Sequence, residues 1–373
     1  MDVIAAANAR AASLAPGDPR VIRMEVGQPS TGAPAGAVAA VTAAMQAGET
    51  LGYTEAFGIR PLRERIASLY AERYGLALDA RRIAITVGAS GAFPLAFLAA
   101  FDRGDHVALA SPFYPPYVNI LTALGLQPIV MEAGAESRFQ PTVAMLERLD
   151  PRPAGLIVAS PCNPAGTMLH RDELAALAAW CEANGVRLIS DEIYHGLTYG
   201  EAASTAAAVS SSAIVINSFS KYWSMTGWRI GWMVLPDDLV RPVERLAQNM
   251  FISAPGIAQV AALAAIDCTE ELDRHVARYR ANRVLLLEAL PKAGLDRLAP
   301  AEGAFYLYAD VGHLTNDSAA FCTRMLAEIG VAATPGVDFD RTRGARSIRF
   351  SFCGATEDMA EAADRLTRWL ARQ

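Results

Sequence analysis

A lysine just past an apolar run is the first residue in this chain whose position suggests chemistry. Lys221 ends the segment 217–221 (NSFSK), and Arg229 follows eight residues later, next to another apolar run. A lysine amine acts as a nucleophile or a base once desolvation or a nearby cation lowers its pKa. An arginine can hold an anion through paired hydrogen bonds. On this window alone, an exposed loop lysine and a structural arginine explain the pattern equally well.

Polar residues at the ends of other apolar runs favour the chemical interpretation. They lie in segments 86–91 with Gly88, Ala89 and Ser90, 111–117 with Tyr114, 160–167 with Asn163, 191–194 with Asp191 and Tyr194, and 347–352 with Arg349. In an open α/β sheet, ligands bind beyond the carboxyl ends of the strands, where such loops meet. We therefore expect these side chains to converge at one edge of a sheet.

Apolar runs and amphipathic helical patterns alternate along most of the chain. The expected strands cover residues 83–87, 107–110, 128–131, 156–159, 186–190, 214–217 and 230–235. Continuous apolar strands that alternate with helices are typical of a mostly parallel sheet covered on both faces. After Pro236, helical patterns up to Leu290 lead into a smaller α+β unit that ends with a helix near Leu370. The sequence therefore predicts an α/β fold with a large and a small domain.

This organisation divides the chain into three parts. Residues 1–45 form an N-terminal arm and part of the small domain, residues 46–275 form the large domain, and residues 276–373 form the small C-terminal domain. The arm is too short to fold alone, because so few residues bury too little apolar surface. We expect it to pack against the C-terminal part or against a second subunit.

Composition narrows the classes of protein. The 373 residues are 52% hydrophobic and 19% charged, which suits large buried cores and excludes a disordered chain. A net charge of −6 argues against a nucleic-acid-binding protein. Five separated cysteines without a CxxC pair indicate reduced, intracellular thiols, and five histidines without ligand spacing predict no metal site. No run approaches the ~18–20 apolar residues that span a membrane, so we expect a cytoplasmic protein.

The motifs together resemble one family. Segments 160–167 (SPCNPAGT) and 218–232 (SFSKYWSMTGWRIGW) are the most specific, and from 26–29 (VGQP) to Arg349 the matches cover nearly the whole chain in the family's order. The chain resembles the pyridoxal-phosphate-dependent aminotransferases of fold type I, the aspartate-aminotransferase-like superfamily. The resemblance implies a large domain that binds pyridoxal 5'-phosphate, L-amino acid and 2-oxo acid substrates, and a homodimer. It implies neither a nucleic-acid nor a membrane partner.

The resemblance implies roles for five residues around the cofactor ring. Lys221 would form the Schiff base with the cofactor aldehyde and then move the substrate α-proton as general base and acid. Asp191 would pair with the ring nitrogen, since an adjacent carboxylate favours the protonated, electron-withdrawing ring. Tyr194 and Asn163 would hydrogen-bond the ring's 3-oxygen, which lowers the pKa of the Schiff base. Tyr114 matches the aromatic residue that stacks on the ring.

Phosphate binding is implied in the same way. The turn at Gly88, Ala89 and Ser90 offers backbone N–H groups at the positive end of a helix dipole. By resemblance, Ser218 and Arg229 complete the phosphate site. Tyr53 matches the tyrosine that reaches the phosphate from the neighbouring subunit, so the active site would be complete only in a dimer.

Substrate binding depends on residues outside these strand ends. Arg349 matches the arginine that binds the substrate α-carboxylate bidentately. Gly27 would add a backbone amide, and Asn163 would face the same substrate. Segments 305–306 and 335–339 resemble those that wall the substrate side. His195 follows Tyr194 directly, so in an extended segment it should point to the opposite face, and we expect a structural role for it.

Three functions are compatible with this chain. The first is an aminotransferase that moves an amino group from an L-amino acid to a 2-oxo acid by ping-pong turnover. The second is a carbon–sulfur β-lyase, which would use the same lysine, aspartate and arginine. The third, a non-enzymatic sensor module, is disfavoured because no helix-turn-helix stretch accompanies the fold.

The substrate side chain is less well specified. No second arginine stands out for a side-chain carboxylate, and the residues after Pro29 depart from the acidic and aromatic pair that is common in the family. Together with Tyr53 and Tyr114, this favours a neutral or aromatic side chain over a dicarboxylate.

Overall fold

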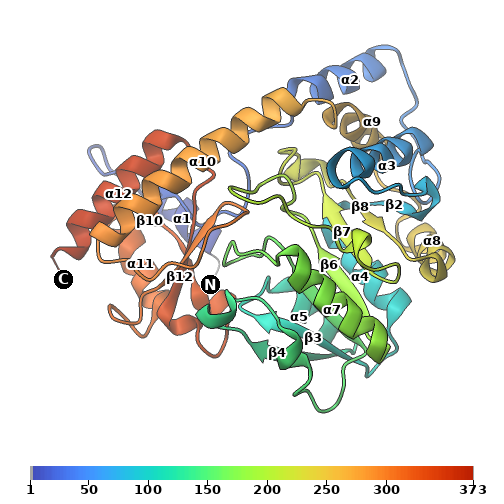
Figure 1. Ribbon diagram of the computed structural model, residues 1–373. Coiled ribbons are helices and arrows are strands. Elements are labelled where there is room, and N and C mark those ends of the chain that lie inside the picture. The colour runs from blue at the N-terminus through green and yellow to red at the C-terminus, as the bar shows by residue number, and fades with distance from the viewer. Residues whose placement is uncertain (1–2, 373) are drawn as a thin grey trace.

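A mostly parallel sheet forms the centre of the larger part of the molecule (Figure 1). The computed structural model describes residues 3–372. Within this range, the sheet has seven strands in the order β2-β8-β7-β6-β5-β3-β4, and β8 alone runs antiparallel to its neighbours. The strands are β2 (Ile83–Thr86), β3 (His106–Ser111), β4 (Gln127–Glu132), β5 (Gly155–Ala159), β6 (Arg187–Asp191), β7 (Ile214–Ser218) and β8 (Gly231–Val234). The predicted α/β fold class is confirmed.

The apolar runs form strands because both faces of this sheet are covered. Along β7, Val215 packs into one hydrophobic cluster, while Ile214 and Ile216 pack into the cluster on the opposite face. Burial on both sides requires apolar residues at successive positions, which explains continuous rather than alternating runs. The covering helices are α3 (Arg60–Tyr74), α4 (Gly88–Ala100), α5 (Pro116–Ala123), α6 (Val143–Leu146), α7 (Arg171–Asn184), α8 (Asp237–Phe251) and α9 (Gly256–Ala265).

Strand register brings the predicted site segments together. Ala159, the last residue of β5, pairs with Asp191, the last residue of β6. Asp191 in turn pairs with Ile216 of β7, two residues before that strand ends. The loops that leave these three strands therefore begin at the same edge of the sheet, as the sequence predicts.

A second unit packs beside the sheet. Its small antiparallel sheet joins β11 (Thr334–Pro335), β12 (Ser347–Ser351) and β9 (Tyr306–Asp310) in that order. Its helices are α10 (Thr269–Lys292), α11 (Ser318–Ile329) and α12 (Thr356–Leu370). Figure 1 shows α10 running from α12 toward α2 and α9. The expected boundary between residues 275 and 276 falls inside α10, so the division into domains stays a prediction.

The N-terminal arm contacts both units. It contains α1 (Val3–Ala12), β1 (Ile22–Arg23) and α2 (Ala35–Gln46). β1 pairs in parallel with β10 (Val331–Ala332), and α1 packs against α11, whereas α2 packs against α9. Packing against the C-terminal part is one of the two arrangements expected from the sequence. Short 3₁₀ helices connect the other elements: η1 (Ala80–Arg82), η2 (Ala135–Ser137), η3 (Ala206–Ala208), η4 (Thr226–Trp228), η5 (Gly336–Asp338) and η6 (Gly344–Arg346).

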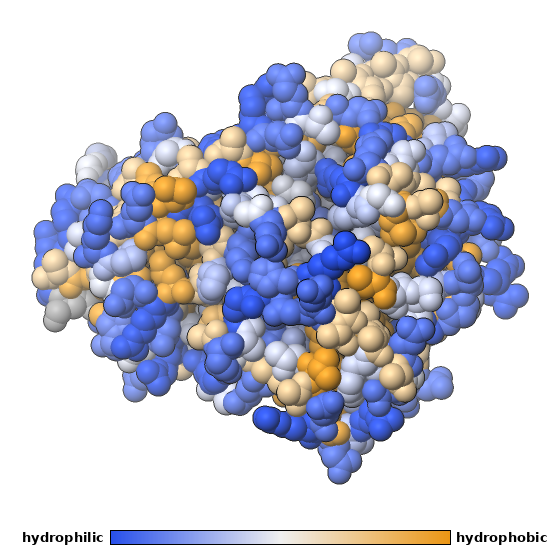
Figure 2. All heavy atoms as spheres, in the orientation of Figure 1, coloured by the Kyte–Doolittle hydropathy of each residue, from blue (hydrophilic) through white to orange (hydrophobic). Residues whose placement is uncertain are grey.

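Figure 2 shows how hydrophilic and hydrophobic residues are distributed over one face of the molecule. On the face drawn in Figure 2, hydrophilic residues cover most of the area and hydrophobic residues form separate patches. Among residues 3–372, no helix is both long and apolar enough to cross a membrane. The cytoplasmic location expected from the sequence stays a prediction.

Candidate active site

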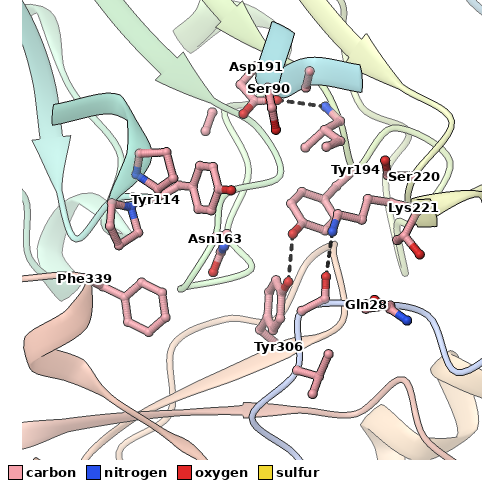
Figure 3. A pocket seen from close by; sticks show the side chains of 18 of the residues that line it. Gln28, Ser90, Tyr114, Asn163, Asp191, Tyr194, Ser220, Lys221, Tyr306 and Phe339 are labelled. Carbon is pink, nitrogen blue, oxygen red and sulfur yellow. Dashed lines mark hydrogen bonds between the residues drawn. The ribbon is translucent and has the colours of Figure 1, made fainter. Parts of the chain in front are cut away.

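A cavity of about 800 Å³ lies at the carboxyl ends of β5, β6 and β7 (Figure 3). Ala159 and Asp191 of its lining end β5 and β6, and Ser220 lies two residues beyond the end of β7. Tyr306 and Arg349 of the small sheet form part of the opposite wall. Lys221 lines the same cavity as Asp191. The amine and the carboxylate therefore lie on the same side of the sheet, as the predicted chemistry requires.

Lys221 lies just beyond β7 with its amine turned toward the N-terminal arm. Its Nζ donates a hydrogen bond to the Gly27 carbonyl at 2.6 Å. Desolvation lowers the pKa of Lys221 to about 8, and the positive charges of Arg349 and Arg229 act in the same direction. An amine with this pKa is partly deprotonated near neutral pH and can act as a nucleophile or a base.

Asp191 is a buried carboxylate at the end of β6. Its side chain accepts hydrogen bonds from the Tyr117 hydroxyl and, at 3.1 Å, from the Ile193 N–H. Burial raises the pKa of Asp191 to about 6, although these two donors and the nearby Lys221 partly oppose the shift. A cationic group in the cavity would stabilise the ionised carboxylate.

Arg349 is almost fully buried, with only 5% of its surface exposed. Its Nη1 donates to Asn163 Oδ1 at 2.8 Å, and its Nη2 donates to the Glu25 carbonyl at 2.7 Å. The guanidinium also lies 4.4 Å from the centre of the Tyr306 ring. Its buried Nε has no hydrogen-bond partner among residues 3–372. Burial without a carboxylate partner in these contacts suits a residue that binds an anionic ligand.

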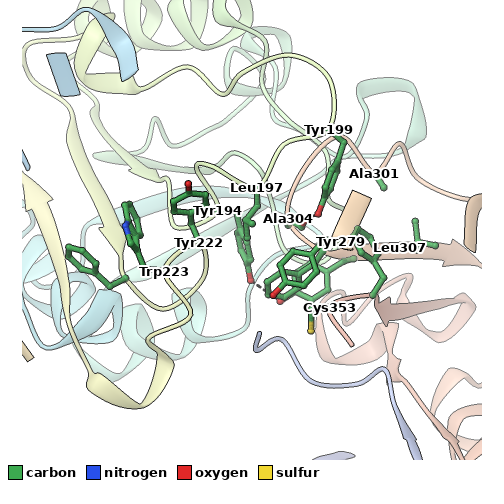
Figure 4. Packing of buried hydrophobic residues seen from close by; sticks show 14 of the residues in the cluster. Tyr194, Leu197, Tyr199, Tyr222, Trp223, Tyr279, Ala301, Ala304, Leu307 and Cys353 are labelled. Carbon is green, nitrogen blue, oxygen red and sulfur yellow. Dashed lines mark hydrogen bonds between the residues drawn. The ribbon is translucent and has the colours of Figure 1, made fainter. Parts of the chain in front are cut away.

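Tyr194 stands between the sheet and the small unit. Its hydroxyl lies 2.7 Å from the Tyr306 hydroxyl, and its ring packs edge-on against Phe305 at 5.6 Å between centres. Figure 4 shows it packed among buried side chains that include Leu197 and Tyr279. Lys221 Nζ lies 5.8 Å from the centre of the Tyr194 ring. This packing fixes the direction in which the Tyr194 hydroxyl points.

The predicted anion site lies where α4 begins. Ala89 and Ser90 line the cavity, and the first N–H groups of a helix lack partners within the helix. Arg229 Nη2 approaches Ser90 Oγ at 3.4 Å, and both residues are exposed. Gly88 has a φ of +64°, and a Cβ there would lie 2.6 Å from Arg229 Nη2. Glycine thus lets the guanidinium approach the helix N-terminus.

Ser218 lies behind this site rather than in the cavity lining. Its hydroxyl contacts Ser220 Oγ at 2.9 Å and donates to the Ile230 carbonyl at 3.1 Å. Ser220, which the sequence did not single out, lines the cavity instead. Both serines occur in the SFSK segment, so spacing alone could not tell which hydroxyl would face inward.

Of the remaining predicted residues, two line the cavity and one lies outside it. Tyr114 and Gly27 line the cavity, and Figure 3 shows Tyr114 across from Tyr194 and Lys221. A Cβ on Gly27 would lie 2.5 Å from the Tyr306 hydroxyl, so a larger residue there would displace that hydroxyl from its contact with Tyr194. Tyr53 lies outside the lining of its own cavity and is 84% exposed.

Three residues at the site were missed or undervalued in the sequence. Tyr117 hydrogen-bonds Asp191, Thr334 accepts from Arg349 Nη2 at 3.1 Å, and Phe339 lies 4.8 Å from the Arg349 guanidinium. Tyr117 follows Tyr114 by three residues, and this near-helical spacing was the one available signal. Segments 305–306 and 335–339 do contribute to the wall, through Tyr306 and Phe339.

The polar groups fit a phosphorylated ring that carries an aldehyde. Within residues 3–372, the cationic side chains of the cavity lining are Lys221, Arg229 and Arg349, and no group of three metal-ligating side chains occurs. The amine of Lys221 suits an aldehyde, and Asp191 suits a protonated ring nitrogen. The α4 N-terminus with Arg229 suits a phosphate.

Comparisons with known proteins agree with this geometry. The model of the family described as aminotransferase class I and II matches residues 19–366. Valine–pyruvate aminotransferase of Mycobacterium tuberculosis is 50% identical over 357 residues, which cover 95% of this chain and 92% of that protein. A (5-formylfuran-3-yl)methyl phosphate transaminase of Methanocaldococcus jannaschii is 33% identical over 356 residues, covering 94% and 92%.

A solved structure shows the same arrangement over the whole chain. The crystal structure of an aminotransferase from Mycobacterium tuberculosis matches with a TM-score of 0.97 at 49% identity, covering 100% of this chain and 96% of that one. The resemblance to fold type I aminotransferases is therefore confirmed, and the protein is an enzyme. This chain belongs to the class I and II aminotransferase family.

Proposed function

We propose that this aminotransferase transfers the amino group of a neutral L-amino acid to a 2-oxo acid, pyruvate among them, with pyridoxal 5'-phosphate held in the cavity. The observation that carries the proposal is the convergence of Lys221, Asp191 and the α4 N-terminus on one cavity.

The chain offers a separate group for each part of the cofactor. Asp191 would pair with the ring nitrogen, and Asn163 and Tyr194 would face the ring oxygen. Tyr114 would cover the ring face. The phosphate would be held by the backbone at Gly88, Ala89 and Ser90 together with Arg229, while Ser218 supports Ser220 from behind. When bound, the cofactor supplies an aldehyde that accepts the amino group and a ring that withdraws electrons.

Lys221 would hold the aldehyde carbon and move the proton. Its pKa of about 8 leaves a substantial neutral fraction near physiological pH. The free Nζ would accept the substrate α-proton as general base and then donate a proton as general acid. The 2.6 Å contact with the Gly27 carbonyl supports an amine directed to the substrate side.

Substrate recognition would begin with the carboxylate. Arg349 offers a rigid fork for the α-carboxylate, and Asn163 and Gly27 lie beside it. Lys221 and Arg229 have the cofactor as their partner in this proposal, so the cavity lining within residues 3–372 leaves no cation for a second carboxylate.

The cavity lining also includes apolar side chains. Ile4, Ile120 and Phe339 contribute aliphatic and aromatic surface to it. The relative named valine–pyruvate aminotransferase fits the same substrate class. We therefore infer neutral, branched aliphatic donors, with dicarboxylates as poor substrates.

Tyr53 would connect each active site to a second subunit. This residue is 84% exposed and lies outside the cavity of its own chain, which suits donation of its hydroxyl to a neighbouring phosphate site. Met45, Met250 and Ile252 are further exposed hydrophobic residues, with exposed fractions of 60%, 45% and 48%. We propose a homodimer in which each Tyr53 completes the other active site.

Single-turnover spectroscopy tests the proposed function. The enzyme is loaded with pyridoxal 5'-phosphate and mixed with one amino acid at a time, and the absorbance of the bound cofactor is followed. Valine and alanine should convert it, and pyruvate should restore it, while aspartate and glutamate react at least roughly tenfold more slowly. Release of pyruvate and ammonia from cystathionine, without amino transfer from any donor, would instead establish the β-lyase.

A further inference from the structure

A second buried cluster lies behind the active site. It is centred on His195, which follows Tyr194 in the chain and points away from the cavity. His195 is 1% exposed, and neither it nor Glu192 lines the cavity. His195 Nδ1 lies 2.7 Å from the hydroxyl of Tyr74, at the end of α3. Its Nε2 lies 3.0 Å from the Ser160 carbonyl. One imidazole therefore connects a covering helix to the loop that follows β5.

These contacts define the tautomer of His195. A carbonyl oxygen only accepts hydrogen bonds, so Nε2 carries the proton and donates to Ser160. Nδ1 is then unprotonated and accepts from the Tyr74 hydroxyl. Burial lowers the pKa of His195 to about 3, so the ring stays neutral in this pair of hydrogen bonds.

Glu192 completes the cluster without adding a charge to it. Its Oε1 accepts from the Ala206 N–H at 2.7 Å and from Ser190 Oγ at 3.1 Å, and its Oε2 lies 3.5 Å from His195 Nδ1. Burial raises the pKa of Glu192 to about 8, which favours its neutral form at neutral pH. Glu192 therefore adjoins His195 without forming an ion pair with it, and its own hydrogen bonds go to Ala206 and Ser190.

Ser160 is the point at which this cluster reaches the active site. Its N–H donates to the Asp191 carbonyl at 3.2 Å, and its hydroxyl accepts from the Leu169 N–H at 2.9 Å. Asn163 follows three residues later in the same loop. Because His195 also adjoins Tyr194 in the chain, it is tied to both residues that face the proposed ring oxygen.

We propose that His195 is a positioning residue that holds the Ser160 carbonyl and thereby fixes Asn163 and Tyr194 relative to Lys221. This inference rests on the proposed function, because its effect is read at the bound cofactor. Misplaced donors stabilise an anionic ring oxygen less well, so the pH at which the cofactor absorbance changes should rise. Asn163 also contacts Arg349, so the KM for the amino donor should rise as well.

The test compares two substitutions at His195 in the cofactor-loaded enzyme. His195→Phe removes both hydrogen bonds, whereas His195→Gln keeps an amide donor near the position of Nε2. We expect His195→Phe to raise the midpoint of the cofactor titration by about one pH unit and the donor KM roughly tenfold. His195→Gln should stay within about twofold of the unmodified enzyme in KM, because the bond to Ser160 is retained.

Two further variants separate positioning from loss of stability. Trp369→Phe removes a hydrogen bond to Glu328 in the small unit, away from the cavity, and should lower the melting temperature without moving the titration. Tyr74→Phe removes only the partner of Nδ1 and should move the titration in the same direction as His195→Phe, by less. If His195→Phe does not fold, Tyr74→Phe provides the test instead. An unchanged midpoint of the cofactor titration in Tyr74→Phe would then overturn the inference.

Failure of the positioning role and failure of the proposed function give different results. If His195→Phe folds and matches the unmodified enzyme in both measurements, or if His195→Gln is as impaired as His195→Phe, the positioning role is wrong. If the unmodified enzyme shows no cofactor band at all, the proposed function fails instead.

Discussion

The two walls of the active-site cavity are built in different ways. The cofactor wall comes from the ends of adjacent strands of one sheet, where register places Ala159 beside Asp191. The substrate wall joins the N-terminal arm to the small sheet, through contacts such as that of Arg349 Nη2 with the Glu25 carbonyl at 2.7 Å. A hydrogen-bonded sheet edge fixes groups closely, whereas segments brought together from separate units can shift and diversify. We therefore expect substitutions on the first wall to abolish the reaction and substitutions on the second to change affinity and selectivity.

The largest effect should follow from removing the amine on the cofactor wall. Lys221→Ala loses both the group that holds the aldehyde and the proton carrier, so kcat/KM for transamination should fall by roughly 10⁴-fold or more. Steady-state assays with valine and pyruvate measure this, and borohydride treatment should trap no cofactor on the chain. Substantial residual turnover would reject the role of Lys221. Lys292→Ala, at the end of α10 and away from the cavity, is the matched control.

The next effect concerns Asp191. Asp191→Asn keeps the shape of the side chain but removes the charge that favours a protonated ring nitrogen, so kcat should fall roughly a thousandfold. The same change should stabilise the apoprotein. Burial raises the pKa of Asp191 from 3.8 to about 6, so the folded chain binds this proton more tightly than the unfolded chain does.

The sign of the stability effect follows from that pKa. Proton binding by Asp191 stabilises the folded apoprotein, and this stabilisation is fully present below about pH 4. It is lost as the pH rises through 6, which lowers the free energy of unfolding by about 3 kcal/mol. Asp191→Asn apoprotein should therefore be more stable than the unmodified apoprotein at pH 7.5 and equally stable near pH 4. Urea unfolding at both pH values checks this, and equal stabilities at pH 7.5 would show that the buried carboxylate carries no such cost.

A smaller effect is expected on the substrate wall. Arg349→Leu removes the fork for the α-carboxylate, so the donor KM should rise roughly a hundredfold, equivalent to about 3 kcal/mol. Cofactor binding should change little, because Arg349 belongs to the other wall. Parallel measurements of KM and of cofactor affinity test both parts. Arg349→Lys keeps the charge without the fork, so its donor KM should lie between those of Arg349→Leu and the unmodified enzyme. A large loss of cofactor affinity in either variant would show that the two walls do not act separately.

The difference between the walls also explains what could be predicted from the sequence. Asp191 directly follows an apolar run, and Asn163 and Lys221 lie within four residues of the ends of two others. Parallel strands align such ends, so local pattern and fold class were enough to bring the three residues together. The antiparallel direction of β8 was not predicted, because a short buried strand has the same apolar pattern in either direction. The expected fold class nevertheless held, since the other strands run parallel.

Contacts between distant segments could not be predicted in this way. The hydrogen bond from Tyr117 to Asp191 depends on how α5 packs on the sheet, and the contact of Thr334 with Arg349 on the register of two strands in the small sheet. Within an alternating strand, Arg349 has the pattern of a surface charge, yet the structure buries it. The family resemblance, rather than periodicity, identified that residue.

The smallest predicted effect tests the selectivity of the substrate wall. Ile4 of α1 lines the cavity and is 49% exposed, so the wall can accept a longer side chain there. Ile4→Arg would supply the cation that the lining of this chain does not offer to a second carboxylate. A partly exposed ion pair contributes up to about 1 kcal/mol, so kcat/KM for glutamate relative to valine should rise roughly fivefold. The gain should shrink at high salt, because ions screen exposed charges. Ile4→Gln has similar length without the charge and should leave the ratio unchanged, and an equal gain in both variants would show that shape rather than charge controls selection at this wall.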